Sequence, residues 1–126
     1  YHILVVDDEE KIRTLIRKYA EFEVHQVTEA ENGMQAVEIC RRTPSLFDII
    51  IMDVMMPVQD GHEATRAIRA MDRPDAKSIP IFAMTANAFA EDRLKALQAG
   101  MNEHLSKPID PDALYRLLVK YLTERG

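Results

Sequence analysis

An apolar run that ends in a carboxylate constrains the fold of this chain more than any other feature. Residues 49–52 read Ile-Ile-Ile-Met, a pattern typical of a strand buried on both faces of a sheet. Asp53 follows at once, and the loop signals Pro57 and Asp60-Gly61 come next. Ligands of open α/β sheets bind beyond the carboxyl ends of the strands, so Asp53 is a candidate site residue. Taken alone, it could equally be a residue that caps a turn.

Composition places the chain among single globular domains. Its 126 residues are enough to bury a core without staples, and its one cysteine, Cys40, allows no internal disulfide, which favours a reducing compartment. The net charge of −5 argues against nucleic-acid binding. Because there is no membrane-length apolar run and no signal peptide pattern, we expect a cytoplasmic domain without direct membrane contact. The chain opens with Tyr1 rather than Met, so we expect residues 1–126 to be one domain of a longer protein, which could be anchored in a membrane.

Strand and helix patterns alternate five times along the chain. The predicted strands cover residues 2–6, 24–28, 49–53, 79–84 and 103–106. Helices are predicted after each strand, the second over about 33–42 and the fourth over about 89–99, while Arg73-Pro74-Asp75 breaks the third and Asp110 caps the fifth. Alternation with short connections implies an α/β fold, with a parallel sheet, right-handed crossovers and helices on both faces.

Polar residues stand at the carboxyl end of four predicted strands. Asp7 and Asp8 end the first, Asp53 the third, Thr85 the fourth and Lys107 the fifth. In a parallel sheet these ends lie on one edge, so the side chains are expected to converge. An acidic helix N-terminus would by itself account for Glu9 and Glu10, but less well for the two aspartates.

Three converging carboxylates repel one another, and a divalent cation would relieve that repulsion. Oxygen ligands alone favour a hard ion, and a small, partly hydrated site favours Mg²⁺. An aspartate such as Asp53 beside Mg²⁺ could attack a phosphoryl group and form an aspartyl phosphate. Lys107 would neutralise charge on the transferred group, and Thr85 could donate a hydrogen bond to it.

Four segments of the chain resemble the response-regulator receiver family of two-component signal transduction. They are residues 3–9 (Ile-Leu-Val-Val-Asp-Asp-Glu), 52–57 (Met-Asp-Val-Met-Met-Pro) with Asp60-Gly61, 84–86 (Met-Thr-Ala) and 106–108 (Ser-Lys-Pro). The similarity covers essentially the whole chain. It implies a flavodoxin-like, doubly wound five-stranded parallel sheet of order 2-1-3-4-5 with five helices, in agreement with the strand and helix pattern.

The resemblance also implies a role for each site residue. Asp53 matches the phospho-acceptor. Asp8 and Asp53 match direct Mg²⁺ ligands, Met55 matches the residue whose backbone carbonyl is a third ligand, and Asp7 matches the residue that holds metal-bound water. Such domains catalyse their own phosphorylation and dephosphorylation.

Around the phosphate, the resemblance assigns Thr85 as the switch hydroxyl and Lys107 as the phosphate-pairing lysine. It further implies a cis peptide bond between Lys107 and Pro108. One position departs from the family pattern: three residues before the lysine, where the family often has a rotating Tyr or Phe, this chain has His104.

The residues in and around two of the motifs indicate which type of receiver the chain resembles. Residues 60–69 and 99–109 resemble receivers of hybrid sensor histidine kinases and phosphorelays. The expected partners are therefore a histidine kinase and a histidine phosphotransfer domain, which would dock over the first helix near Ile12, with the isolated domain a monomer. Self-association through the last two helices and the last strand is the alternative.

Three rival functions remain in view. A phosphohydrolase of the Asp-x-Asp type would need an acid where Met55 stands, and a nucleotide-binding module would need a Gly-rich loop where the chain has Asp-Asp-Glu-Glu. The serious alternative is a pseudo-receiver, a protein-interaction module that is not phosphorylated. The usual mark of a pseudo-receiver is the loss of the acceptor or of an acid, and this chain keeps them all.

Overall fold

The computed structural model describes residues 1–23, 25–43, 47–54, 60–85 and 90–125. Five parallel strands form one sheet in the order β2-β1-β3-β4-β5. The strands are β1 (His2–Val6), β2 (Gln26–Ala30), β3 (Ile49–Asp53), β4 (Ile81–Thr85) and β5 (Glu103–Ser106). The predicted doubly wound fold and its strand order are confirmed, and β3, the apolar run that ends in Asp53, is the central strand.

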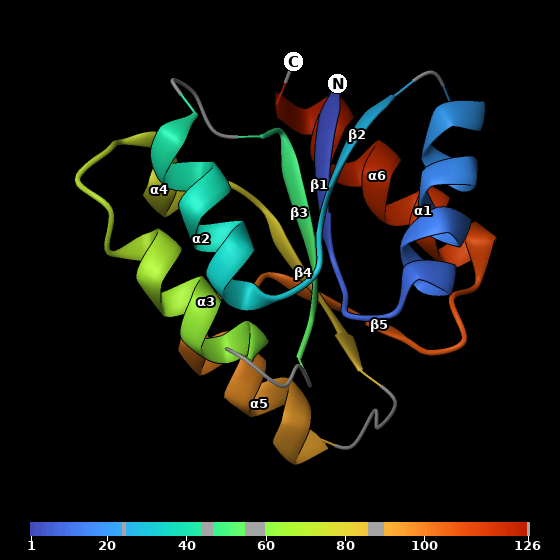
Figure 1. Cartoon of the computed structure of the whole chain (residues 1–126). Coiled ribbons are helices and arrows are strands. Elements are labelled where there is room, and N and C mark those ends of the chain that lie inside the picture. The colour runs from blue at the N-terminus through green and yellow to red at the C-terminus, as the bar shows by residue number, and fades with distance from the viewer. Residues whose placement is uncertain (24, 44–46, 55–59, 86–89, 126) are drawn as a thin grey trace.

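Helices cover both faces of the sheet (Figure 1). Two of them, α1 (Glu10–Phe22) and α6 (Pro111–Arg125), lie on one face. The other face carries α2 (Gly33–Arg42), α3 (Gly61–Arg69), the short α4 (Asp75–Ser78) and α5 (Ala90–Ala99). Among the described residues no helix is both long and apolar enough to cross a membrane.

Alternate residues of each central strand enter two separate cores. Leu4, Val6, Ile50 and Met52 pack toward α2, α3 and α5, whereas Ile3, Val5, Ile49 and Ile51 pack toward α1 and α6. Successive side chains of a strand point to opposite faces, so a strand covered on both sides must be apolar throughout. All eight of these side chains are fully buried, which is why an uninterrupted apolar run precedes Asp53.

The second strand begins two residues later than predicted, at Gln26 rather than at residue 24. The chain is still completing the end of α1 at that point, because the backbone N–H groups of Glu23 and His25 both donate to the carbonyl of Ala20, at 3.1 and 3.0 Å. Gln26 is the first residue to pair with β1. Val24, which suggested the earlier start, lies outside the described residues.

The third connection holds a sixth helix that the sequence analysis did not predict. Pro74, expected only to break a helix, adopts φ −60° and ψ −40° and is the N-cap residue of α4. The guanidinium of Arg73 holds this turn, donating to Asp75 and to the carbonyls of Cys40 and Thr43. The turn delays β4, predicted from residue 79, to Ile81.

Local sequence signals set the ends of three further helices, and the cap predicted at Asp110 is one of them. Asp110 caps α6 by accepting a hydrogen bond from the Asp112 amide, and Gly100 ends α5 with a positive φ of 106°. Asp60 caps α3 by accepting a hydrogen bond from the Glu63 amide at 2.8 Å. Cys40 is a fully buried core thiol, and burial raises its pKa to about 11.

Candidate functional site

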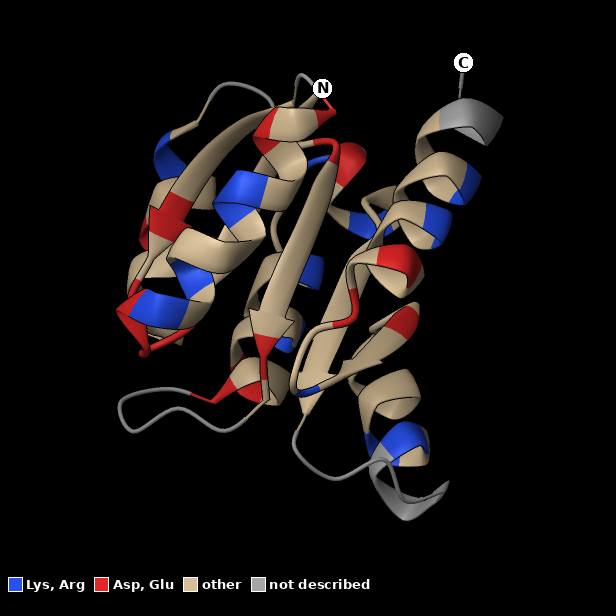
Figure 2. Ribbon diagram, turned by 90° about the vertical axis from the view of Figure 1, so that its right-hand side faces the viewer, with Lys and Arg blue, Asp and Glu red and all other residues tan. Residues whose placement is uncertain are grey.

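Three aspartates meet at the carboxyl edge of the sheet. Asp7 directly follows β1, and Asp53 is the last residue of the neighbouring β3. Asp7 and Asp53 are buried, whereas Asp8 is exposed at the mouth. One carboxylate oxygen from each of the three residues lies within 4.8 Å of the others. Acidic segments follow the end of a strand at the lower edge of the sheet in Figure 2. The edge is therefore a compact acidic pocket built from two adjacent strands.

Lys107 enters this pocket from the end of β5. Its Nζ lies 3.0 Å from Oδ2 of Asp7 and 3.3 Å from Oδ2 of Asp53. The backbone positions it: the Lys107 amide donates to the carbonyl of Thr85 at 2.9 Å, and the Lys107–Pro108 peptide bond is cis, as expected. One ammonium therefore bridges the two buried carboxylates.

Charge in the pocket is incompletely balanced. Burial raises the pKa of the Asp7 carboxyl, and it outweighs the lowering effect of the Glu9 amide and of Lys107. Burial acts to lower the pKa of Lys107, but its ion pairs with Asp7 and Asp53 raise that pKa above the ordinary value. Lys107 is thus held firmly as a cation, but this one ammonium faces three clustered carboxylates, which favours a further cation at the mouth.

The donor set fits Mg²⁺. Every candidate ligand of the cluster is a carboxylate oxygen, and oxygen ligands bound to one Mg²⁺ at about 2.1 Å lie roughly 3 to 4 Å apart. The 4.8 Å spread of Asp7, Asp8 and Asp53 is close to that span, and the exposure of Asp8 leaves the mouth open to water. The residues present could therefore hold a partly hydrated divalent ion with small side-chain adjustments.

Thr85 lies at this edge of the sheet, and His104 lies on the adjacent β5, two residues further from the edge. Thr85, the last residue of β4, is 9% exposed and pairs in register with Ser106. His104 lies on β5 beside Ala83 and is half-buried; burial and the nearby Arg93 lower the pKa of its imidazole. The structure brings Asp7, Asp8, Asp53 and Lys107 together. Met55 lies outside the described residues.

The sequence analysis missed one residue near the pocket, Arg13 on α1. Arg13 is only 8% exposed, and its guanidinium donates a hydrogen bond to the backbone carbonyl of Asp7 at 2.8 Å. A signal was available: Arg13 falls next to Ile12 on a helix whose inward face is otherwise apolar, and a buried arginine requires partners. The identity of those partners depends on strand pairing, which the local pattern does not supply.

The fold and the pocket together define a doubly wound α/β domain with an acidic cation pocket at its strand ends. Comparison with known proteins identifies the family. The family model of the response regulator receiver domain matches residues 3–119, and this chain belongs to that family.

Similar proteins include a transcriptional regulatory protein and a signal transduction histidine kinase. The chain is 40% identical to the transcriptional regulatory protein ResD of Bacillus subtilis over 98% of this chain and 48% of ResD. It is 38% identical to the histidine-protein kinase BarA of Escherichia coli, over 98% of this chain and 13% of BarA. It thus spans about half of one relative and a small part of the other.

Solved structures agree. The receiver domain of sensor histidine kinase PA1611 from Pseudomonas aeruginosa, whose structure is described as having a magnesium ion coordinated in the active site cleft, is 39% identical, with a TM-score of 0.86 over 97% of each chain. The present chain is a receiver domain of the two-component type, homologous to receivers of hybrid histidine kinases.

Proposed function

We propose that this domain accepts a phosphoryl group from a phosphohistidine onto Asp53 in a Mg²⁺-dependent reaction, and relays it to a histidine phosphotransfer domain. One observation carries the proposal: Asp53 is buried at the end of β3, clustered with two further carboxylates and 3.3 Å from the ammonium of Lys107. A nucleophile, a cation site and a fixed positive charge thus share one pocket.

The roles of the residues follow from their positions. A carboxylate oxygen of Asp53 would form the new bond to phosphorus while the P–N bond of the donor breaks and its electron pair stays on the imidazole. The Lys107 ammonium, which now bridges Asp7 and Asp53, would turn to the oxygens of the transferred group. Thr85, at the end of the adjacent β4, would donate its hydroxyl to the same oxygens.

Bound Mg²⁺ would supply charge neutralisation between the carboxylates and the incoming phosphoryl group. Asp8, Asp53 and the carbonyl of Met55 would hold it directly, and Asp7 would hold it through water. We favour a hybrid kinase or phosphorelay as the source of the domain because residues 60–69 and 99–109 resemble such receivers, and because BarA and PA1611 are sensor kinases.

Phosphorylation by a small donor tests the proposal. With acetyl phosphate and Mg²⁺, intact-mass spectrometry is expected to find one added phosphoryl group per chain. Chelation of Mg²⁺ should slow its formation by at least about 100-fold, since an uncompensated dianion would have to approach three carboxylates. Equal labelling with and without Mg²⁺, or no labelling at all, would count against the proposed function.

Mg²⁺ is also expected to stabilise the fold, since the ion would bind the folded pocket and not the unfolded chain. At ten times the dissociation constant, linkage gives about 1.4 kcal/mol, or about 5 °C in the melting temperature of a domain this size. Thermal unfolding with MgCl₂ and with NaCl at matched ionic strength measures the difference. A melting temperature that responds to ionic strength alone would show that no specific site exists.

The relay partner is proposed to dock over the start of α1. Ile12 is half-buried against the core, so its outer surface is available, and Leu15 is partly exposed one turn along. Both lie just after the loop that carries Asp7 and Asp8, where an amphipathic helix of a partner could cover them. Apolar contact next to the acceptor would bring the partner histidine to Asp53.

Substitutions at these two positions test the docking surface. Leu15→Ser and Ile12→Ser are expected to slow transfer to a histidine phosphotransfer domain by about tenfold, as for other central interface residues. Labelling by acetyl phosphate should stay unchanged, and Ile12→Ser should cost about 1 kcal/mol of stability because the side chain is partly core. Val119→Ser, an exposed apolar residue on α6, is the control. Normal transfer by both α1 variants would refute docking there.

A further inference from the structure

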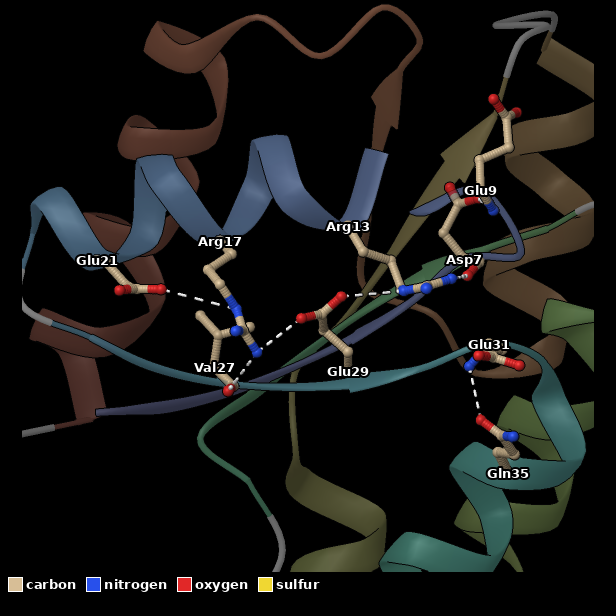
Figure 3. Close-up of polar contacts among 9 residues, drawn as sticks. All are labelled: Asp7, Glu9, Arg13, Arg17, Glu21, Val27, Glu29, Glu31 and Gln35. Carbon is tan, nitrogen blue, oxygen red and sulfur yellow. Dashed lines mark hydrogen bonds and ion pairs between the residues drawn. The ribbon is translucent and has the colours of Figure 1, made fainter. Parts of the chain in front are cut away.

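Arg13 is a buried cation with a divided set of contacts. On α1 it is 8% exposed; its Nη1 donates to the carbonyl of Asp7 at 2.8 Å, and its Nε pairs with Oε1 of Glu29 at 3.0 Å (Figure 3). Glu29 lies on the edge strand β2, and its Oε2 also pairs with Arg17 at 2.6 Å. One guanidinium therefore ties α1, β2 and the loop after β1 together.

Arg13 contacts the loop after β1, which carries two candidate residues of the metal site, Asp7 and Asp8. The carbonyl of Asp7 belongs to the peptide group that links Asp7 to Asp8, so its direction sets the direction in which Asp8 leaves the loop. Two further bonds hold the same turn: the Asp7 amide donates to Ala30 at 3.1 Å, and the Asp7 carboxylate accepts from the Glu9 amide at 2.8 Å. Of these three bonds, only the one from Arg13 joins a side chain of another element to the backbone of the loop, because Lys107 pairs with the Asp7 carboxylate instead.

Glu29 in turn fixes Arg13. The carboxylate binds Nε, so the planar guanidinium can place Nη1 in one direction only, and that direction is the Asp7 carbonyl. Arg17 holds the other oxygen of Glu29, and Figure 3 shows these residues as a continuous chain of contacts from the middle of α1 to the loop. Burial of the guanidinium makes each of these bonds costly to lose.

We propose that Arg13 is a positioning residue, which orients the Asp7–Asp8 peptide so that the Asp8 carboxylate faces the cation site. The inference rests on the proposed Mg²⁺ site. The effect that we expect from removing Arg13 is opposite to the effect that charge alone predicts. Removing a positive charge beside an acidic pocket would by charge alone tighten cation binding, whereas removing a positioning contact loosens it.

Three variants separate these effects. Arg13→Met removes both the charge and the contacts. Arg13→Lys keeps the charge and can keep the Glu29 pair, but its ammonium ends one bond short of the Nη1 position that reaches Asp7. Arg17→Met is the matched control. Arg17 lies on the same helix as Arg13 and pairs with the same Glu29 carboxylate, so the substitution removes a cation there but leaves the bond from Arg13 to the loop in place.

The dissociation constant for Mg²⁺ is measured by NMR titration of backbone amide shifts, without any phosphoryl donor. Both Arg13 variants are expected to weaken binding by about tenfold, the effect typical of residues that orient metal ligands, and Arg17→Met by less than about twofold. In the ion-free state, the ¹⁵N shift of the Asp8 amide should move in the Arg13 variants alone, because that amide shares its peptide group with the Asp7 carbonyl.

Each outcome decides the proposal. Unchanged or tighter Mg²⁺ binding by Arg13→Met overturns it, as does wild-type affinity in Arg13→Lys, which would show that the charge is sufficient. Should Arg13→Met fail to fold, Arg13→Lys still gives the answer. Absence of Mg²⁺ binding by the unaltered chain overturns the proposed site itself, whereas unaltered binding in the variants overturns only the role of Arg13.

Discussion

Asp53→Asn is expected to abolish phosphorylation of the chain. The substitution is nearly isosteric, so the 3%-exposed position at the end of β3 stays filled. A neutral amide, however, is a poor nucleophile, and it removes one of the carboxylates that would hold Mg²⁺. The other two carboxylates of the cluster are not the proposed acceptor, since Asp7 is fully buried in its pair with Lys107 and Asp8 lies at the exposed mouth. We therefore expect labelling to fall below detection.

The same substitution is expected to leave the fold intact and its stability unchanged or slightly higher. It removes one of three mutually repelling charges, while Lys107 keeps its 3.0 Å pair with Asp7. Intact mass after incubation with acetyl phosphate and Mg²⁺, together with thermal unfolding, measures both effects. Asp72→Asn, on the exposed turn after α3, should label normally. One added phosphoryl group on a folded Asp53→Asn chain would place the acceptor elsewhere and sink the assignment.

Strongly periodic segments made the fold predictable from sequence. The uninterrupted apolar run of β3 and the buried leucines of α6 (Leu114, Leu118 and Leu122) each admit one arrangement, and strand ends in a parallel sheet must share an edge. The convergence of Asp7, Asp8, Asp53 and Lys107 therefore followed from the parallel arrangement of the strands. Their catalytic roles rest on the proposed function.

Other features depended on contacts between distant segments. The short α4 depends on Arg73, which reaches the carbonyls of Cys40 and Thr43. The contact of Arg13 with the Asp7 loop likewise requires Glu29 of β2 as its second partner. A window of neighbouring residues contains none of these distant partners of Arg73 and Arg13, so the local pattern underdetermined these two features. The late start of β2 is different, because it follows from local hydrogen bonds back to Ala20 that complete the end of α1.

Gly61→Ala is expected to give the largest loss of stability of any single-methyl addition near the site. Gly61 is the buried first residue of α3, and its amide donates to the carbonyl of Val54 at 3.1 Å. A Cβ at this position would collide with the backbone oxygen of Asp53 and lie 3.0 Å from the Cα of Val54. Backbone atoms of a central strand cannot rotate away as a side chain can, so α3 must move off the sheet or Asp53 must shift.

The expected loss of stability is about 3 kcal/mol, the upper part of the range for overpacking. The clash therefore outweighs the gain of up to about 1 kcal/mol that alanine brings to a helix over glycine. Urea denaturation measures it as a lower midpoint at unchanged slope. Asp60→Ala is the neighbouring control: it removes the α3 cap at a cost of about 1 kcal/mol but leaves the Asp53 backbone untouched. Under conditions where both variants are folded, Gly61→Ala alone should also slow labelling by acetyl phosphate, since the displaced atom belongs to the acceptor residue. Equal stability of the two variants would mean that α3 yields freely and that glycine is not required for its approach to β3.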